Sequence, residues 1–201
     1  MHTPSQKRQM EDFPIVVIGA STGGPPIVEQ IVTTLPKTTR ACILIAQHMP
    51  KNFTAQMSER LARNTAIPLA EAHDGDRLQS GMIFIAPGNH CMEIVRNRNH
   101  EPVIRITDEC KTGREATPSI DDLMRSTAKL FGSHVTGFLL TGMGRDGTLG
   151  MQFIRNLGGT TYAQEPSTCI VDSMVQYAIG CDAIDHTVLP GSISSIISRL
   201  T

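Results

Sequence analysis

Three side chains that together could perform nucleophilic acyl chemistry each follow a predicted buried strand. Ser21 follows the apolar run 14–19, His48 follows 41–46, and Asp146 lies in a glycine-rich loop after 135–140. A serine hydroxyl becomes a nucleophile when an imidazole removes its proton, and a carboxylate orients and stabilises that imidazole. The three residue types therefore predict a serine nucleophile with a histidine base and an aspartate partner.

The segment around Ser21 has the form of a strand-to-helix turn. Residues 19–23, Gly-Ala-Ser-Thr-Gly, fit the pattern G-x-S-x-G, in which glycines permit a tight backbone and the amides of the next helix face the reacting atom. Pro25 and Pro26 mark the start of that helix. The alternative interpretation is a helix N-cap without chemistry.

Alternatives also exist for the other two residues. His90 is the closest rival of His48 for the role of the base. Asp146 precedes a glycine and a helical pattern, so it could simply cap that helix. Glycines on both sides of it nevertheless make a loop in which the Met143 amide could face an oxyanion. The competing aspartates lie in a loop and at a helix start, which give no comparable reason for a catalytic role: Asp108, Asp121 and Asp122.

The elements that must position these side chains alternate between short apolar runs and helical patterns. This alternation predicts an α/β fold with a doubly wound, mostly parallel sheet covered by helices on both faces, whose functional groups gather at the carboxyl ends of the strands. Strands are expected at 14–19, 41–46, 67–70, 82–86, 135–140, 160–163 and 184–188. Helices are expected at 26–35, 53–63, 120–131, 147–156 and 173–179.

The segment 81–106 breaks this alternation. Two apolar runs, 82–85 and 92–95, flank Pro87–His90 without a helix between them, which predicts a β-hairpin excursion. Asp74 and Asp76 resemble half of a metal loop, but further ligands at suitable spacing are lacking, so we interpret them as the entry to a hairpin. Loops are expected at 97–101 and 108–116.

Composition limits the setting of the protein. The 201 residues carry a net charge of −1, no Trp and two Tyr, which argues against a nucleic-acid surface. The five cysteines form no C-x-x-C pair, so we expect isolated thiols in a reducing compartment. A signal peptide and a membrane-spanning run are not evident, and we expect a soluble cytoplasmic protein.

Several motifs occur in order between about residues 13 and 190. They are Gly19–Pro25, Gln47–Pro50 with Phe53-Thr54, Asp74–Asp76, Ile85–Gly88, Pro118–Asp121, Leu140–Gly147, and Gly158-Gly159 with Ala163-Gln164. Through these motifs the chain resembles the catalytic domain of the CheB-type chemotaxis protein-glutamate methylesterases. The resemblance implies a triad of Ser21, His48 and Asp146, with Thr22 and Met143 contributing to the oxyanion hole. It also accounts for the chain order Ser, His, Asp, which differs from that of α/β-hydrolases with the same serine motif.

The resemblance implies an activity as well. Such an enzyme removes methyl groups from glutamate γ-methyl esters in the cytoplasmic helices of chemoreceptors, releases methanol, and also deamidates receptor glutamines. It needs no metal or organic cofactor, no nucleic acid and no membrane insertion. One alternative is a serine hydrolase of the same fold that acts on another ester or amide. The other is a non-catalytic phosphate- or nucleotide-binding domain, although the loop 19–24 lacks the Gly-Lys-Ser/Thr ending of a P-loop.

Two features depart from the family pattern. A polar tail, 1–13, precedes the expected catalytic domain, 14–201, where family members commonly carry a receiver domain, so we expect none in this chain. Residues 170–175 lack the usual aromatic-Gly-Met-Pro run, and Asp172 and Val175 stand where the aromatic residue and the proline are expected. If that segment borders the cleft, the fit of the substrate would differ.

Overall fold

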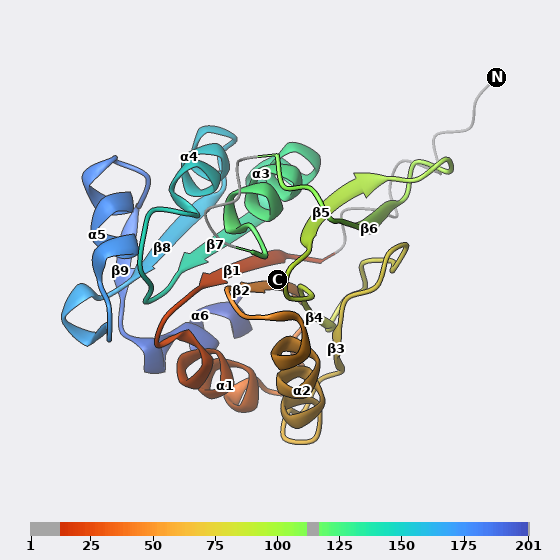
Figure 1. Ribbon diagram of the computed structural model, residues 1–201, viewed down its shortest axis with the longest axis horizontal. Helices are drawn as coiled ribbons and strands as arrows, with labels where there is room; N and C mark the ends of the chain where they lie inside the picture. Colours follow the sequence, from red (N-terminus) through yellow and green to blue (C-terminus); the bar gives the residue numbers. More distant parts are fainter. Residues whose placement is uncertain (1–12, 112–116, 201) are drawn as a thin grey trace.

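A parallel sheet forms the centre of this computed structural model, which describes residues 13–111 and 117–200 (Figure 1). Across the sheet the order is β3 (Leu69–Glu71), β4 (Ile83–Ile85), β2 (Cys42–Gln47), β1 (Ile15–Ala20), β7 (Val135–Leu139), β8 (Thr160–Gln164) and β9 (His186–Val188). All neighbouring strands in it run parallel. The predicted doubly wound α/β fold is confirmed. Except for Phe13, the predicted polar tail lies outside the described residues, as do residues 112–116 of the predicted loop.

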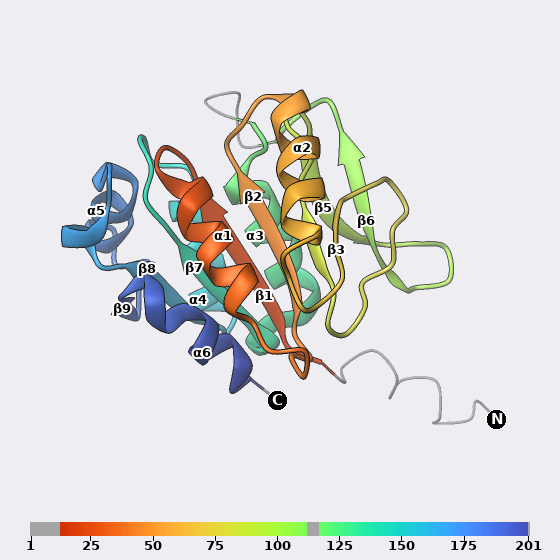
Figure 2. The ribbon, with the colours of Figure 1, turned by 90° about the horizontal axis from the view of Figure 1, so that it is seen from below.

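Helices cover both faces of the sheet, as Figure 2 shows from below. One face packs against α1 (Gly24–Thr34), α2 (Lys51–Ala62) and α6 (Ile193–Ser198), and the other against α3 (Ile120–Phe131), α4 (Thr148–Asn156) and α5 (Ser173–Gly180). In β1, Ile15 and Val17 enter one core, whereas Val16 and Ile18 enter the other. Because both faces are buried, β1 is apolar throughout instead of alternating.

The predicted helices are all present, with ends within two residues of those expected. The short helix α6 was not predicted, because its sequence, ISSIIS, is too short and too rich in serine to show a clear helical period. Within the part of the chain that the structure describes, none of the helices combines the length and the apolar character that crossing a membrane requires.

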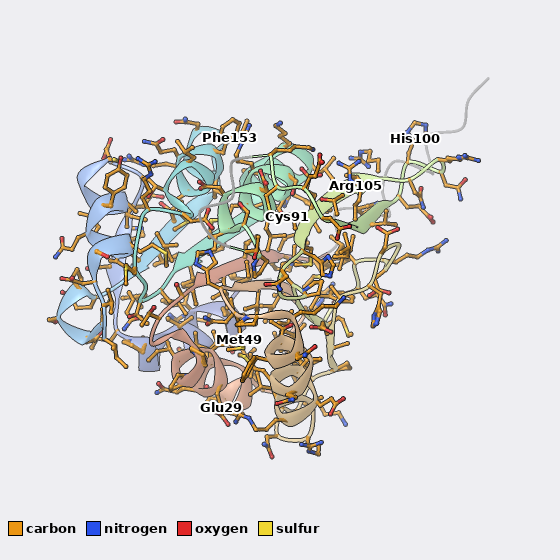
Figure 3. The ribbon with its side chains drawn as sticks, viewed as in Figure 1. Glu29, Met49, Cys91, His100, Arg105 and Phe153 are labelled. Carbon is orange, nitrogen blue, oxygen red and sulfur yellow. A yellow bond between two sulfur atoms is a disulfide. The ribbon has the colours of Figure 1, made fainter. Side chains whose placement is uncertain are left out.

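The predicted β-hairpin is present, but its strands were partly misassigned. It consists of β5 (Cys91–Arg96) and β6 (Pro102–Thr107), which pair antiparallel, whereas the run 82–85 contains β4 of the main sheet. The turn closes at Asn97, whose Oδ1 accepts hydrogen bonds from the amides of Asn99 at 2.8 Å and Glu101 at 3.0 Å. This local side-chain turn, with His100 at the hairpin tip in Figure 3, determines which segments pair.

Asp74 and Asp76 hold a loop against the hairpin. The Oδ1 atom of Asp74 accepts a hydrogen bond from the Ile106 amide at 2.9 Å, and Asp76 Oδ2 accepts one from the His73 amide at 2.8 Å. The Gly75 amide donates to the Ile104 carbonyl at 2.9 Å. The Asp74 carboxylate therefore fastens the loop to β6, whereas the Asp76 carboxylate closes the loop on itself.

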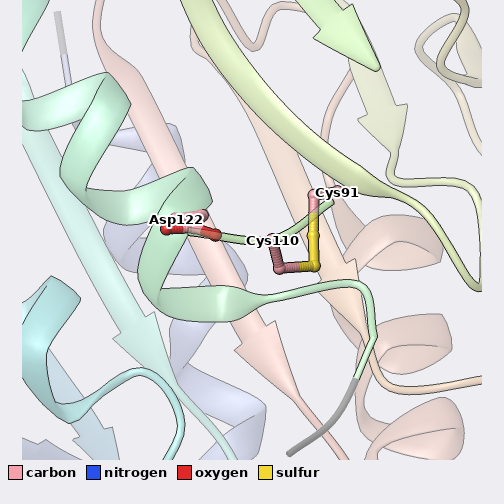
Figure 4. Close-up of side chains that lie close together, drawn as sticks. All are labelled: Cys91, Cys110 and Asp122. Atoms are coloured by element: carbon pink, nitrogen blue, oxygen red, sulfur yellow. A yellow bond between two sulfur atoms is a disulfide. The ribbon is translucent and has the colours of Figure 1, made fainter. Parts of the chain in front are cut away.

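The expectation of isolated thiols is wrong for two cysteines. Cys91, at the start of β5, forms a disulfide with Cys110, which follows β6, and their Cα atoms lie 5.4 Å apart. Figure 4 shows the bridge facing Asp122 on α3. The sulfur atoms of Cys91 and Cys110 and a carboxylate oxygen of Asp122 lie within 4.8 Å of one another. Because both sulfur atoms form the disulfide, thiolates that could bind a metal are not available in this state. Spacing alone does not reveal the pair, because the cysteines lie 19 residues apart.

The glycine that begins the serine motif permits a close approach between β1 and α3. A Cβ atom on Gly19 would lie 2.3 Å from Cγ2 of Ile120, the first residue of α3. A larger residue at position 19 would therefore push α3 away from the sheet.

We expect Gly19→Ala to lower the free energy of unfolding by about 1–3 kcal/mol, because the added methyl group overpacks this contact. For a protein of this size, each kcal/mol lowers Tm by about 2–4 °C, which calorimetry can detect. Gly180→Ala is the matched control, since its Cβ would meet nothing within 4 Å at the end of α5. An unchanged Tm in Gly19→Ala would contradict the proposed packing role.

Candidate active site

Strand register brings Ser21 and His48 together. In the β1–β2 pair Ala20 lies opposite Gln47, so Ser21 and His48 are the next residues along neighbouring strands. The His48 amide donates to the Ala20 carbonyl at 2.9 Å. The buried Gln47 side chain donates through Nε2 to the carbonyls of Ser21, at 2.9 Å, and His48, at 3.2 Å. Both residues therefore occupy a fixed position at the carboxyl edge of the sheet.

The neighbour on the other side of β1 supplies the third residue. The Ser21 amide donates to the Thr141 carbonyl at 3.0 Å, just beyond β7. The Thr141 amide donates to the side chain of Gln164 at 2.9 Å, which anchors the start of the loop that carries Asp146. The chain moves from β1 to β2 on one side and returns as β7 on the other. This reversal of strand order makes a switch point, the usual place for a site in an open α/β sheet.

The three side chains form one line of hydrogen bonds. Ser21 Oγ lies 3.1 Å from His48 Nδ1, and His48 Nε2 lies 2.8 Å from Asp146 Oδ2. Ser21 is 9% exposed, and the side chains of His48 and Asp146 are 10% and 13% exposed. A carboxylate only accepts, so it favours the tautomer with hydrogen on Nε2 and leaves Nδ1 free to accept from Ser21. The arrangement can therefore activate the serine hydroxyl.

The helix-cap alternatives for Ser21 and Asp146 do not hold. The N-cap of α1 is Gly23, and that of α4 is Gly147. Neither end has a side-chain capping hydrogen bond. The α1 turn is closed instead by the Gly24 amide, which donates to the Ser21 carbonyl at 2.8 Å. The side chain of Ser21 therefore does not cap α1, and that of Asp146 does not cap α4.

Backbone amides fix the Asp146 carboxylate. Its Oδ2 accepts from the Ile120 amide at 2.8 Å, and its Oδ1 accepts from the amides of Asp121 and Gly147, each at 3.0 Å. Ile120 and Asp121 are the first residues of α3, whose N-terminus favours negative charge. With His48 included, N–H donors hold both oxygens of this carboxylate in place.

Nothing in the sequence indicated that Asp121 belongs to the site, but the structure places it beside Asp146. This residue is 6% exposed, and its Oδ1 accepts a hydrogen bond from the Gly150 amide at 2.7 Å. Burial and the neighbouring charge of Asp146 raise the pKa of the Asp121 carboxyl to about 6, although the amides of Gly150 and Gly147 act in the opposite direction. Acidic residues are common in first helical turns, so the sequence carried little signal for this placement.

The two residues predicted for the oxyanion hole belong to segments close to Ser21. Thr22 follows Ser21 directly and is exposed. A Cβ atom on Gly142 would lie 2.6 Å from the Cβ atom of Ser21, so the peptide joining Gly142 to Met143 passes next to Ser21. The Met143 side chain is 67% exposed at this edge.

The segment 170–175, which departs from the family pattern, borders this site. The Gly142 amide donates to the Val171 carbonyl at 2.8 Å, and the Met174 amide donates to the Gly142 carbonyl at 3.1 Å. A Cβ atom on Gly23 would lie 2.7 Å from the Cβ atom of Ile170. The segment therefore contacts both loops that flank Ser21.

Apart from Asp121, the competing residues lie elsewhere. His90 pairs through Nδ1 with Asp108 Oδ1 at 2.8 Å, near the hairpin. Asp122 accepts a hydrogen bond from the Lys111 amide at 2.7 Å. A cavity of about 430 Å³ between the hairpin and α3 is lined by Arg105, labelled in Figure 3, and other residues that do not include the triad.

Comparison with known proteins agrees with this arrangement. The family model for the CheB methylesterase matches residues 16–197. A "Protein-glutamate methylesterase/protein-glutamine glutaminase 2" from Methanosarcina acetivorans is 42% identical over 163 residues, which are 80% of this chain and 46% of the relative. A protein with the same name from Dechloromonas aromatica is 40% identical over 89% of this chain and 50% of its own length. The chain thus spans about half the length of these relatives.

A solved structure covers the same region. The crystal structure of the Thermotoga maritima CheB methylesterase catalytic domain superposes with a TM-score of 0.88 and 32% sequence identity. The match covers 94% of this chain and 100% of that domain. The chain therefore belongs to the CheB methylesterase family.

Proposed function

We propose that this chain is a serine hydrolase that removes methyl groups from glutamate γ-methyl esters of chemoreceptors and deamidates receptor glutamines. The observation that carries the proposal is the line of hydrogen bonds from Ser21 through His48 to Asp146. The names of the relatives, protein-glutamate methylesterase/protein-glutamine glutaminase, support both reactions.

The geometry supports a two-step mechanism. Ser21 Oγ attacks the γ-carbonyl carbon while His48 Nδ1 takes the hydroxyl proton. When the tetrahedral intermediate collapses, the same nitrogen gives that proton to the departing methoxide, which leaves as methanol. Water, activated by His48, then hydrolyses the acyl-enzyme, which restores the Ser21 hydroxyl and leaves a glutamate side chain on the receptor. With glutamine the acylation step expels ammonia instead. Asp146 keeps the imidazole oriented and stabilises its positive charge.

The oxyanion of the tetrahedral intermediate needs hydrogen-bond donors. We assign this role to the amides of Thr22, in the loop of Ser21 itself, and of Met143, in the neighbouring loop after β7. Each well-placed donor of this kind stabilises the transition state by about 3–4 kcal/mol. The approach of Gly142 to Ser21 supports the assignment, because a side chain at position 142 would separate the two loops.

An apolar rim supports a helical protein substrate. Phe53, Met143 and Ile170 come from three segments that flank the triad, and they are 59%, 67% and 71% exposed. Exposed apolar groups around a polar centre are typical of an interaction surface. We infer that a receptor helix lies on this rim and presents its esterified side chain to Ser21. Because Ile170 belongs to the atypical segment 170–175, the unusual sequence of that segment would alter which receptor fits.

Methanol release from a methylated receptor tests the proposal, together with labelling by a serine-directed fluorophosphonate. We expect both methanol and labelling of Ser21. Labelling without methanol would identify a serine hydrolase of another ester or amide. Absence of both would point to the non-catalytic binding domain.

The histidine assignment gives a separate prediction. We expect His48→Gln to reduce methanol release by at least 1000-fold, because the base is lost, whereas His90→Gln should remain within a few-fold of the wild type. Steady-state assays of both variants measure the difference, and a larger loss in His90→Gln would reverse the assignment.

A further inference from the structure

The N-termini of α3 and α4 meet beside the triad and exchange carboxylates. Asp146, which precedes α4, accepts hydrogen bonds from the amides of Ile120 at 2.8 Å and Asp121 at 3.0 Å, in the first turn of α3. Asp121 in turn accepts one at 2.7 Å from the amide of Gly150, in the first turn of α4. Each helix thus receives at its N-terminus a carboxylate carried by or next to the other helix.

The two helices lie side by side on one face of the sheet, and small residues let them approach closely (Figure 1). A Cβ atom on Gly150 would lie 2.5 Å from Cβ of Met124 and 3.3 Å from Cα of Asp121. The N-cap of α4 is Gly147, which has no side chain to accept from the amides of the first turn. Asp121 therefore supplies the acceptor that the sequence of α4 lacks.

We propose that Asp121 is a positioning residue for the triad: its carboxylate fixes the first turn of α4 against α3 and so orients Asp146 toward His48. Asp146 is joined directly to Gly147, so a shift of the first turn of α4 moves the triad carboxylate. A displacement of about 1 Å in a catalytic group can cost about 100-fold in rate. The inference rests on the proposed function, because it assumes that the triad activates Ser21.

The charge of Asp121 is electrostatically unfavourable at this position. A buried carboxyl next to a second carboxylate is unfavourable when both are ionised, and here burial and Asp146 raise the pKa of Asp121 to about 6. The charge of Asp121 beside Asp146 therefore does not stabilise the fold. Its hydrogen bond from the Gly150 amide instead fixes the geometry of the first turn of α4.

The test compares three variants at pH 8, where Asp121 is ionised. The measurements are the second-order rate of Ser21 labelling by a fluorophosphonate, and kcat and KM for methanol release from a methylated receptor. We expect Asp121→Ala to lower the labelling rate and kcat about 10- to 100-fold with KM within about twofold. We expect Asp121→Asn to recover both to within about threefold, because its amide oxygen can still accept from Gly150.

Asp122→Ala is the matched control. This neighbouring residue is also buried, at 3% exposure, but its carboxylate accepts from the Lys111 amide and faces the Cys91–Cys110 bridge (Figure 4). We expect its labelling rate and kcat to stay within about twofold of the wild type. Thermal denaturation checks that each variant is folded, and Asp121→Asn provides a shape-conserving variant if Asp121→Ala does not fold.

Three results would overturn the inference: an unchanged labelling rate in folded Asp121→Ala, equal losses in Asp121→Asn and Asp121→Ala, or an equal loss in Asp122→Ala. Labelling requires only a reactive Ser21. If the wild type releases no methanol but the labelling rates follow the expected order, the methylesterase proposal fails while the role of Asp121 stands.

Discussion

Replacing Ser21 with alanine should reduce ester hydrolysis by about a millionfold while the protein stays folded. Losses of this size follow removal of the nucleophile in subtilisin, where the remaining triad members cannot compensate. The hydroxyl of Ser21 contacts His48 Nδ1, and the turn around it is held by backbone hydrogen bonds to Thr141 and Gly24. Alanine can keep those bonds, so we expect little change in Tm.

Methanol release and fluorophosphonate labelling measure the loss in Ser21→Ala. Ser198→Ala is the matched control, because its hydroxyl donates to the Ser194 carbonyl at 2.7 Å within α6. We expect Ser198→Ala to remain within a few-fold of the wild type and to be labelled. Turnover by Ser21→Ala within tenfold of the wild type, in a preparation free of contaminating hydrolase, would refute the nucleophile assignment.

The positions of Ser21 and His48 could be predicted because parallel strands align their carboxyl ends. Once two buried runs are recognised as neighbouring strands, the residue after each run must lie at the same edge of the sheet. Here the register pairs Ala20 with Gln47, which places the two side chains next to each other. Asp146 was accessible by the same reasoning, since its loop follows the strand on the other side of β1.

The environment of Asp146 could not be predicted in the same way. Its amide partners belong to Ile120 and Asp121, which are about 25 residues distant in sequence and lie at the start of a helix. Helix packing brings them there, through the contact between Gly19 and Ile120, and no local pattern encodes that contact. The same limit applies to the hairpin partner of β5 and to the bridge between Cys91 and Cys110.

The amide contacts around Asp146 lead to the second large effect, which is expected for Asp146→Asn. The Oδ2 atom faces donors from His48 and Ile120, and Oδ1 faces donors from Asp121 and Gly147. An asparagine has one oxygen and one NH₂ group, so in either orientation its NH₂ group points at two N–H donors. If NH₂ faces His48, it donates to Nε2 and favours the tautomer with hydrogen on Nδ1, which cannot accept the Ser21 proton.

We therefore expect Asp146→Asn to lower kcat by about 10,000-fold, the loss that the equivalent change causes in a serine protease through the wrong tautomer. The unsatisfied donors should also lower the free energy of unfolding by about 1–3 kcal/mol. Steady-state kinetics and chemical denaturation measure the two effects.

Asp185→Asn is the matched control. Asp185 likewise accepts hydrogen bonds from buried groups, the Thr161 amide and hydroxyl, each at 2.9 Å, but it does not bond to Ser21, His48 or Asp146. It should lose stability but keep its kcat, since no triad group bonds to it. If Asp146→Asn also keeps a kcat near that of the wild type, Asp146 serves only to anchor the start of α3, and Ser21 and His48 act as a dyad.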